Sequence, residues 1–472
     1  MTCLRTVAVV VLTATFGILP VLSIQALAQD ASTTRIELSD GASLARQLLL
    51  AGQPDAARQI AQALLLGNPD DTQALILLAQ SQLQLGNSEG ARQAARRAWR
   101  SAKTQRERFS AAFTMADVLA AQESYSRSQL WLRRAIHSAP GQQSEIVATD
   151  AFRRVRQVNP LAVEVSFGLN PSSNVNSGNS NETISFAFLQ GPFAELQFAV
   201  PPGERPLSGL EISLQTDLRY RIAESEKSRT SLEFGIYGRT YVMSESARKS
   251  APEVTGESLS YGQVSMGILH QWQPVDSKSL YSASLTYSHD WAAGSPYRYE
   301  LDGTIGTQFT LENDAALTVS GGVRYSHNFA SETEVITYSL RGGWSRELAN
   351  DDTVGVIGQM AKATAQATDL AYEEATLGVS YDFGELSANN VSLGLDLMTS
   401  YTEKHRVYET SAFDPAGRED RISSLRFDVG FDNVDFYGFQ PVVTFQARRT
   451  ASSVDRFDTE GGQIGVNLRS SF

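Results

Sequence analysis

The chain has 472 residues with 40 Lys+Arg and 52 Asp+Glu, a formal net charge of −12 at pH 7. This length allows two or three domains, and the acidic balance argues against a nucleic-acid partner, because phosphate backbones select basic surfaces. Residues 1–160 hold 17 basic and 12 acidic residues, whereas the remainder holds 23 and 40. A conduit for an anionic polymer should be basic, so the acidic second half disfavours such a cargo.

The amino-terminal residues have the pattern of a secretory signal peptide. Arg5 precedes an apolar run from Val7 to Leu22, and the small residues that follow predict cleavage after Ala28. An uncleaved anchor is the alternative, but Pro20 would interrupt a continuous spanning helix. Cys3 is the only cysteine and would leave with the signal, so we expect no disulfide in the mature chain. Export without a further spanning helix predicts the periplasm or the outer membrane.

Residues 29–40 are expected to be a linker, and residues 41–157 to form a helical repeat domain. The turn sequence around Gly52 recurs around Gly86, 34 residues later, which is the period of tetratricopeptide repeats. A weaker third copy has its turn at Glu123. Stacked helix pairs of this kind leave a concave surface for peptides or proteins. A helical array that only spaces or plugs the following domain is the alternative.

Within these repeats, some side chains are better explained by packing than by binding. We expect the aromatic residues to form the core between stacked helices; they are Trp99, Phe109, Phe113 and Trp131. The pair Arg133 and Arg134 is most simply a solvated face. A last helix is expected to run from about Ser144 to Val158, where Pro160 ends it.

Residues 158–472 alternate apolar and polar side chains with a period of two. From Leu210 to Ile222 the apolar residues share one face and the charged residues share the other. The repetition of this pattern predicts an α+β multi-domain chain in which the helical repeats precede a 14-stranded antiparallel transmembrane β-barrel. The expected strands are 161–169, 208–223, 229–243, 257–273, 279–291, 296–311, 315–328, 332–347, 352–364, 369–384, 389–402, 419–433, 437–448 and 462–472.

The connections between these strands predict an orientation. Long connections follow odd-numbered strands, at 170–207, 244–256, 401–418 and 449–461, while those after even-numbered strands are short. Outer-membrane barrels have short periplasmic turns and long outer loops, so the helical domain is expected in the periplasm. Aromatic residues near strand ends are candidates for interfacial girdles; they are Tyr287, Trp291, Tyr297, Tyr325, Trp344, Tyr381, Phe383 and Tyr401.

The charged face of the strands should line the lumen. The lumen-facing candidates are Asp217, Arg219, Arg221, Glu233, Arg239, Arg426, Asp428 and Arg469. We interpret them as a mutually neutralising lining. Phe472, at the end of the closing strand, is expected on the lipid face as a signal for the barrel assembly machinery.

The sequence gives little support for catalysis or cofactors. It has no Gly-Lys pair for a nucleotide loop, and its five histidines lack metal-ligand spacing. A barrel hydrolase would need Ser288 beside His289, or Ser326 beside His327, but neighbouring residues point to opposite faces of a strand. We therefore expect neither an enzyme nor a cofactor.

Two stretches resemble a known family. Asn170-Pro171 with Asn174 and Asn176, after the first strand, is similar to the Asn-x-Asn segment that opens the barrel of surface lipoprotein assembly modifier (Slam) proteins. Near the end, Gly438, Pro441 and Arg449 resemble that family's closing strands. The plan of signal peptide, short repeat domain and barrel is similar too.

The resemblance implies an outer-membrane translocator. It would receive client lipoproteins or other secreted proteins, or their periplasmic chaperone, at the helical domain and deliver the client to the cell surface. Two alternatives remain open: a polysaccharide exporter of the helical-scaffold-plus-barrel type, and a porin with a periplasmic tether. An exporter of that type would be expected to have more repeats.

Overall fold

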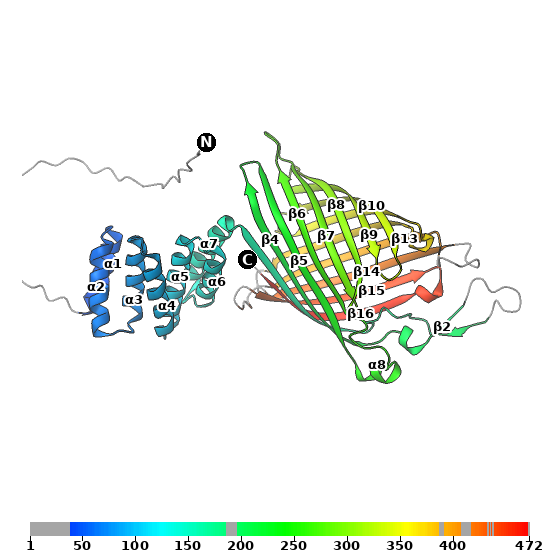
Figure 1. Cartoon of the computed structure of the whole chain (residues 1–472), viewed down its shortest axis with the longest axis horizontal. Helices are drawn as coiled ribbons and strands as arrows, with labels where there is room; N and C mark the ends of the chain where they lie inside the picture. The colour runs from blue at the N-terminus through cyan, green and yellow to red at the C-terminus, as the bar shows by residue number, and fades with distance from the viewer. Residues whose placement is uncertain are drawn as a thin grey trace, which may run out of the picture.

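The computed structural model describes residues 38–185, 196–386, 391–406, 417–431, 434, 436 and 439–470. A row of helices leads to one end of a large β-barrel (Figure 1). The expected signal peptide and its cleavage site after Ala28 lie outside the described residues. The helices are α1 (Leu38–Leu50), α2 (Pro54–Gly67), α3 (Thr72–Gln84), α4 (Ser88–Ser101), α5 (Gln105–Ala121), α6 (Tyr125–His137) and α7 (Gln142–Val158).

The helices form three antiparallel pairs followed by α7, and the same turn closes each pair. Gly52 and Gly86 have φ values of 71° and 79°, and Glu123 stands at the corresponding turn with φ 57°. This left-handed conformation lets the chain reverse within a few residues, and glycine adopts it without steric cost. Helix α1 already begins at Leu38, so it takes up the end of the expected linker.

Small residues allow these helices to pack closely. Ala45, Ala57, Ala61, Ala79 and Ala95 are fully buried between the first pairs. The expected aromatic core packs against the third pair and α7, where the rings of Trp99 and Trp131 meet edge to face with centroids 5.2 Å apart; its members are Trp99, Phe109, Phe113 and Trp131. The repeats therefore have a continuous core of their own.

The second part is a closed antiparallel barrel of fourteen strands, in the order β1-β16-β15 and on through β5-β4 back to β1. Each strand pairs with its neighbours in the chain, and β1 closes the cylinder against β16. The strands are β1 (Leu161–Ser172), β4 (Gly209–Glu224), β5 (Ser228–Met243), β6 (Tyr261–Trp272), β7 (Leu280–Ala292), β8 (Ser295–Thr310), β9 (Ala315–Asn328), β10 (Thr333–Glu347), β11 (Thr353–Ala365), β12 (Tyr372–Leu386), β13 (Val391–Lys404), β14 (Arg418–Phe431), β15 (Phe439–Ser452) and β16 (Thr459–Ser470).

The expected number of strands is confirmed, while several strand ends differ. The long connection expected at 449–461 is wrong, because β15 continues to Ser452 and β16 already begins at Thr459. The fourth strand starts at Tyr261, since the residues before it form turns. The connection after β1 contains a two-stranded sheet of β2 (Thr183–Ile184) and β3 (Phe198–Ala199). Helix α8 (Glu245–Ser250) follows β5.

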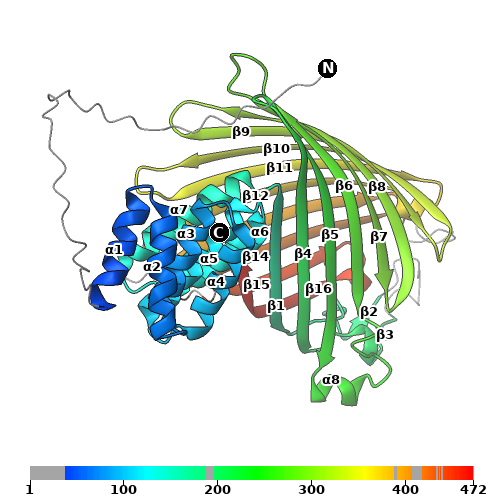
Figure 2. The ribbon, with the colours of Figure 1, turned by 60° about the vertical axis from the view of Figure 1, so that its left-hand side comes forward.

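We call the end of the barrel beside the helices the near end and the opposite end the far end. Sheet β2–β3 and α8 lie at the far end (Figure 2). Short turns lie at the near end, as in the three residues between β4 and β5, while the far end has the longer connections together with short turns such as the two residues between β7 and β8. This arrangement agrees with the expected alternation of short and long connections.

Apolar side chains cover the outside of the barrel. Leu214, Tyr220 and Ile222 project outward from β4 and are 48%, 46% and 49% exposed. Aromatic rings gather towards both ends, for example Trp272 stacked on Tyr281 near the helices. This exterior is consistent with an outer-membrane β-barrel. Among the described helices, none has both the length and the hydropathy required to cross a membrane.

Replacing Glu123 by glycine should stabilise the helical region by about 0.5–1 kcal/mol, because glycine removes the steric cost of the left-handed turn but makes the unfolded chain more flexible. The measurement is urea unfolding of the full chain in detergent, followed by the helical circular-dichroism signal.

Gly52→Ala and Gly86→Ala are the matched controls and should lower the same midpoint, since both positions have positive φ. Equal effects of all three substitutions would contradict the assignment of one shared turn.

Candidate functional site

The lumen is lined by charged side chains that pair with one another. Arg219 forms an ion pair with Glu233 at 2.7 Å, and Arg426 forms one with Asp428 at 2.9 Å. Elsewhere on the wall, Arg324 pairs with Asp302 at 3.0 Å. Pairing across strands, and along β14 for Arg426 and Asp428, neutralises these groups without removing them from water.

The structure places most of the lumen-facing candidates on this inner face. Arg239, Arg426 and Asp428 border a cavity of about 810 Å³ towards the far end, whereas Asp217 and Glu233 lie nearer the helices. Arg221 lies at the near rim of the barrel, where it contacts the end of α7. Arg469 lies in β16 opposite Gln440, and its side chain lies outside the described residues.

The far end of the β1–β16 seam is held by asparagine side chains. Asn176 Nδ2 donates to the carbonyls of Gly203 and Arg205, at 2.9 and 2.8 Å, and its Oδ1 accepts from Leu207 N at 2.9 Å. Asn174 Nδ2 donates to Gly178 O and across the seam to Glu460 O, both at 2.9 Å. The two asparagines of the resemblance motif therefore shape the loop and fasten it to the last strand.

Further residues of the same loop reach the connection between β15 and β16. Asn179 Nδ2 and Asn181 Nδ2 donate to Asp455 O at 2.9 and 3.2 Å, and Ser180 N donates to Asp458 O at 2.9 Å. These contacts join two segments that lie at opposite ends of the barrel sequence. The sequence offered a signal for them, because a run of asparagines that is unusual for a long loop precedes Glu182.

The strand pairing at the seam is short. Four registered pairs join β1 to β16, from Phe167–Leu468 to Ser172–Gln463, whereas β1 and β4 pair over the full length of β1. Pro171 has no N–H to donate and is absent from the β16 ladder. From Leu161 to Ser166, β1 has no partner in β16 among the described residues.

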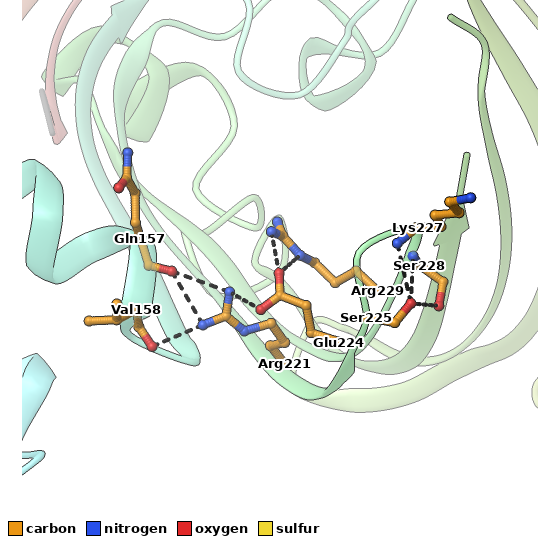
Figure 3. A network of polar contacts seen from close by, with 8 residues as sticks. All are labelled: Gln157, Val158, Arg221, Glu224, Ser225, Lys227, Ser228 and Arg229. Atoms are coloured by element: carbon orange, nitrogen blue, oxygen red, sulfur yellow. Dashed lines mark hydrogen bonds and ion pairs between the residues drawn. The ribbon is translucent and has the colours of Figure 1, made fainter. Parts of the chain in front are cut away.

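The helical region is docked on the near end beside this seam. The Arg221 guanidinium on β4 donates to the carbonyls of Gln157 and Val158, the last residues of α7, at 3.3 and 2.9 Å (Figure 3). Glu224 holds that guanidinium at 3.0 Å and also pairs with Arg229 at 2.7 Å. An arginine at the carboxyl end of a helix satisfies its free carbonyls and favours its dipole.

Helix α6 makes the second contact with the barrel. Arg133 donates to Ser470 Oγ at 3.0 Å, and its guanidinium lies 5.6 Å from the ring centres of both Phe152 and Phe439. The interpretation of Arg133 as a solvated face is therefore wrong: the side chain is half-buried between α7 and the end of β15. Arg134 lies 4.5 Å from the Trp131 ring centre, so it also packs rather than standing free. Phe439 and Ser470 lie in the barrel, so the periodicity of α6 could not reveal them as partners of Arg133.

Asn159 fixes the link between the two parts. Its Nδ2 donates to Gln129 Oε1 at 2.6 Å and to Ser126 Oγ at 3.2 Å, while its Oδ1 accepts from Leu161 N at 3.1 Å. The residue is buried, with 9% of its surface exposed. The helical region is thus joined to the barrel by a bonded corner rather than a free linker.

The remaining expected site residues have varied positions. Pro441 pairs with Leu468 of β16 and stands just before the β14–β15 ladder begins at Val442. Arg449 is exposed near the far end. Asn170 is buried in the lumen wall and donates to Glu211 Oε1 at 3.3 Å. Gly438 and Phe472 lie outside the described residues.

The serine and histidine pairs weighed for hydrolysis are separated by the sheet. Ser288 is buried in the β7 wall. The His289 ring packs against Trp291 and Phe329, with ring centroids 4.3 and 5.3 Å apart. No group of three or more His, Cys, Asp or Glu among the described residues has a metal-binding arrangement.

One carboxylate in the helical region has a shifted pKa. Asp117 on α5 reaches solvent, but the protein packed around it raises the pKa of its carboxyl to about 6, and the positive charge of Arg154 on α7 opposes the shift. Folding therefore favours the protonated form relative to the unfolded chain. The charge of Asp117 between α5 and α7 is therefore lost by protonation in weakly acidic conditions.

Asn176→Ala should loosen the far-end loop while leaving the barrel closed, because three backbone groups lose their partners at about 1–3 kcal/mol for each group left unpaired. The measurement is limited proteolysis of the full chain in detergent, with faster cleavage expected between residues 200 and 208. The control Thr183→Ala, which removes one exposed bond to Gln197, should leave that rate unchanged. Slow cleavage of both variants would show that Asn176 does not hold the loop.

Asp117→Asn should raise the unfolding midpoint of the helical signal more at pH 7.5 than at pH 4. A carboxyl whose folded pKa lies above its ordinary value of 3.8 destabilises the fold as pH rises through the interval between the two values. Above about pH 6 both states are ionised and the folded state keeps the desolvation cost. A midpoint difference that does not change with pH would contradict the shifted pKa.

Comparisons with known proteins concern the helical region. Residues 48–112 match the family model described as tetratricopeptide repeat. Among curated proteins, no sequence matches the chain. Similar solved structures include the first tetratricopeptide-repeat domain of the human RPAP3 protein, at 14% identity over 25% of this chain and 90% of that chain, with a TM-score of 0.23.

Two further similar solved structures cover a similar share of this chain. The type III secretion translocator chaperone SycD of Yersinia enterocolitica is 16% identical over 27% of this chain and 90% of that chain, with a TM-score of 0.23. PcrH in complex with the chaperone binding region of PopD is 20% identical over 25% and 91%, also with a TM-score of 0.23. The helical part of this chain is a tetratricopeptide-repeat region, and a closed fourteen-stranded antiparallel barrel follows it.

Proposed function

We propose that this protein is an outer-membrane translocator that receives client proteins in the periplasm and delivers them to the cell surface. The clients are surface lipoproteins or related secreted proteins, as for the Slam family that the sequence resembles. The barrel spans the membrane, and the tetratricopeptide region binds the client or its periplasmic chaperone. The protein acts without catalysis or a cofactor, and the barrel assembly machinery inserts it into the lipid.

The docking of the repeats on the barrel is the observation that carries this proposal. Arg221, Arg133 and Asn159 each join α6 or α7 to the barrel wall or to the strand that begins it. A segment held on the repeats would therefore be positioned beside the barrel mouth. A flexible tether would not give this positional advantage, because the effective concentration at the mouth falls as a linker lengthens.

The lumen and the seam offer two routes through the barrel. The lining of paired charges gives a wet interior that binds no single sign of charge strongly. The β1–β16 seam has four registered pairs and no described partner for the first half of β1. Opening that half would break few hydrogen bonds, whereas the asparagine contacts would keep the far end joined.

The two alternatives are less well supported. A polysaccharide exporter for an anionic polymer would need a basic lumen, whereas here the arginines on the wall are paired with carboxylates. A porin needs no domain bonded to its mouth. Single-channel recording separates the porin, because a large steady current is expected from a porin and a mostly closed state from a translocator.

Deletion of residues 41–157 with the barrel retained should abolish surface display of a cognate client encoded by a neighbouring reading frame. The physical reason is that the client would no longer be concentrated at the mouth. Protease accessibility of the client on intact cells measures the effect.

Heat-dependent gel mobility of the truncated protein is the control, because a folded barrel migrates differently from an unfolded one. Full display by a correctly inserted truncated barrel would eliminate the proposed role of the repeats.

A further inference from the structure

A cavity of about 640 Å³ lies where the repeats meet the barrel. Helices α6 and α7 form one side of it, and the first residues of β1 with the near ends of β4, β5, β15 and β16 form the other. Both faces of β1 contribute, since Ala162 points to the lumen side and Val163 to the outside. The cavity reaches both faces beside the half of β1 that has no described β16 partner.

The polar part of this cavity is strongly basic. Among the described residues, five arginines and no Asp or Glu line it; the arginines are Arg133, Arg156, Arg219, Arg221 and Arg229. Glu224 and Glu233 pair with three of them from outside the lining, so these seven residues carry three net positive charges. Arg156 is exposed and forms no ion pair with the described residues.

This basic site contrasts with the rest of the barrel half. Residues 161–472 hold 23 basic and 40 acidic residues, so a cavity lined by arginines with a net positive charge is the exception there. Arginine forks match the geometry of phosphate oxygens and keep their charge at any physiological pH. The charge of the cavity therefore selects an anion, and a phosphate in particular.

The apolar part of the cavity continues onto the outer wall of the barrel. Leu161, Val163 and Val165 follow one another on the outward face of β1, and Val163 is 44% exposed. Tyr220, opposite Leu161 on β4, is an outward aromatic at the same level. Aromatic residues of membrane barrels lie at the level of the lipid head groups, so the arginines stand at head-group height and the valines at the height of acyl chains.

We propose that this cavity binds one anionic diacyl phospholipid of the leaflet on the near side of the membrane. The phosphate contacts Arg156 and Arg133, and an acyl chain lies along Leu161, Val163 and Val165. The lipid lies beside the first residues of β1 and bridges the barrel to α6 and α7. A free anion would leave the apolar strip uncovered. An acidic peptide has no long apolar chain that could cover Leu161, Val163 and Val165 at the depth of the acyl chains.

This inference rests on the barrel's position in a membrane and not on client transport. It is tested on the purified full chain without any client, so its failure is distinct from failure of the proposed function. The protein is delipidated in a neutral detergent, incubated with long-chain phosphatidylglycerol, and analysed by native mass spectrometry for retained lipid. Phosphatidylcholine, which has no net charge, is the second probe.

One phosphatidylglycerol per chain should be retained, and retention should fall about tenfold in the double variant Arg133→Gln/Arg156→Gln, because hydrogen bonds to charged groups contribute most of the head-group affinity. Val163→Thr should weaken retention of the lipid by several-fold through the loss of apolar contact. Arg153→Gln is the matched control, since Arg153 lies on the same helix, pairs with Asp150 and does not line the cavity.

Three outcomes would overturn the proposal. The first is equal retention of lipid by the double variant and the Arg153→Gln control, with folding of both verified by heat-dependent gel mobility. The second is equal retention of phosphatidylcholine. The third is full displacement of the lipid by glycerol phosphate at the same concentration, which would show that a free anion suffices and the apolar strip contributes nothing.

Discussion

The satisfaction of backbone hydrogen bonds governs this fold. A strand in a membrane cannot leave its N–H and C=O groups facing lipid, because each unpaired group costs several kcal/mol. Thirteen of the fourteen neighbouring strand pairs meet this requirement with long ladders, such as the one between β4 and β5. Among the described residues, the pair β1–β16 is the line of the wall with the fewest registered contacts, four in all. The other unusual features of the molecule are arranged around that line.

The two ends of the seam are supported in different ways. At the far end, asparagine side chains of the β1–β4 loop bond to backbone groups of β16 and of the connection before it. Such bonds replace ladder pairs and fix the loop at the same time. At the near end the support comes from the tetratricopeptide region, through Arg133 to Ser470 and through Asn159 to Leu161. The repeats therefore act as part of the barrel's closure.

This arrangement connects binding to the wall itself. Any displacement of α6 or α7 would disturb the contacts of Arg221 with the end of α7 and of Arg133 with β15 and β16. A client on the repeats and a lipid in the basic cavity would thus act on neighbouring contacts. Coupling of this kind requires only that each ligand favours one arrangement of the same few side chains.

Much of the architecture could be predicted from the sequence, because the periodicity of apolar residues depends only on neighbours along the chain. The period-two alternation predicted fourteen strands, and the 34-residue spacing of Gly52 and Gly86 predicted the repeats. The periplasmic side that the loop lengths predict for the helices stays a prediction. Strand ends were less certain, since β15 and β16 extend beyond their expected limits by pairing with each other.

The tertiary structure alone decided the contacts between distant segments. Arg133 reads as a surface residue in its helix, yet its partners Phe439 and Ser470 lie more than 300 positions away. The same holds for Asn174 and Glu460, and for the arginines that gather in the near-end cavity. Sequence patterns determined which face of each element is apolar, because that depends on neighbours along the chain. Which faces meet depends on how the barrel closes, and no local pattern records it.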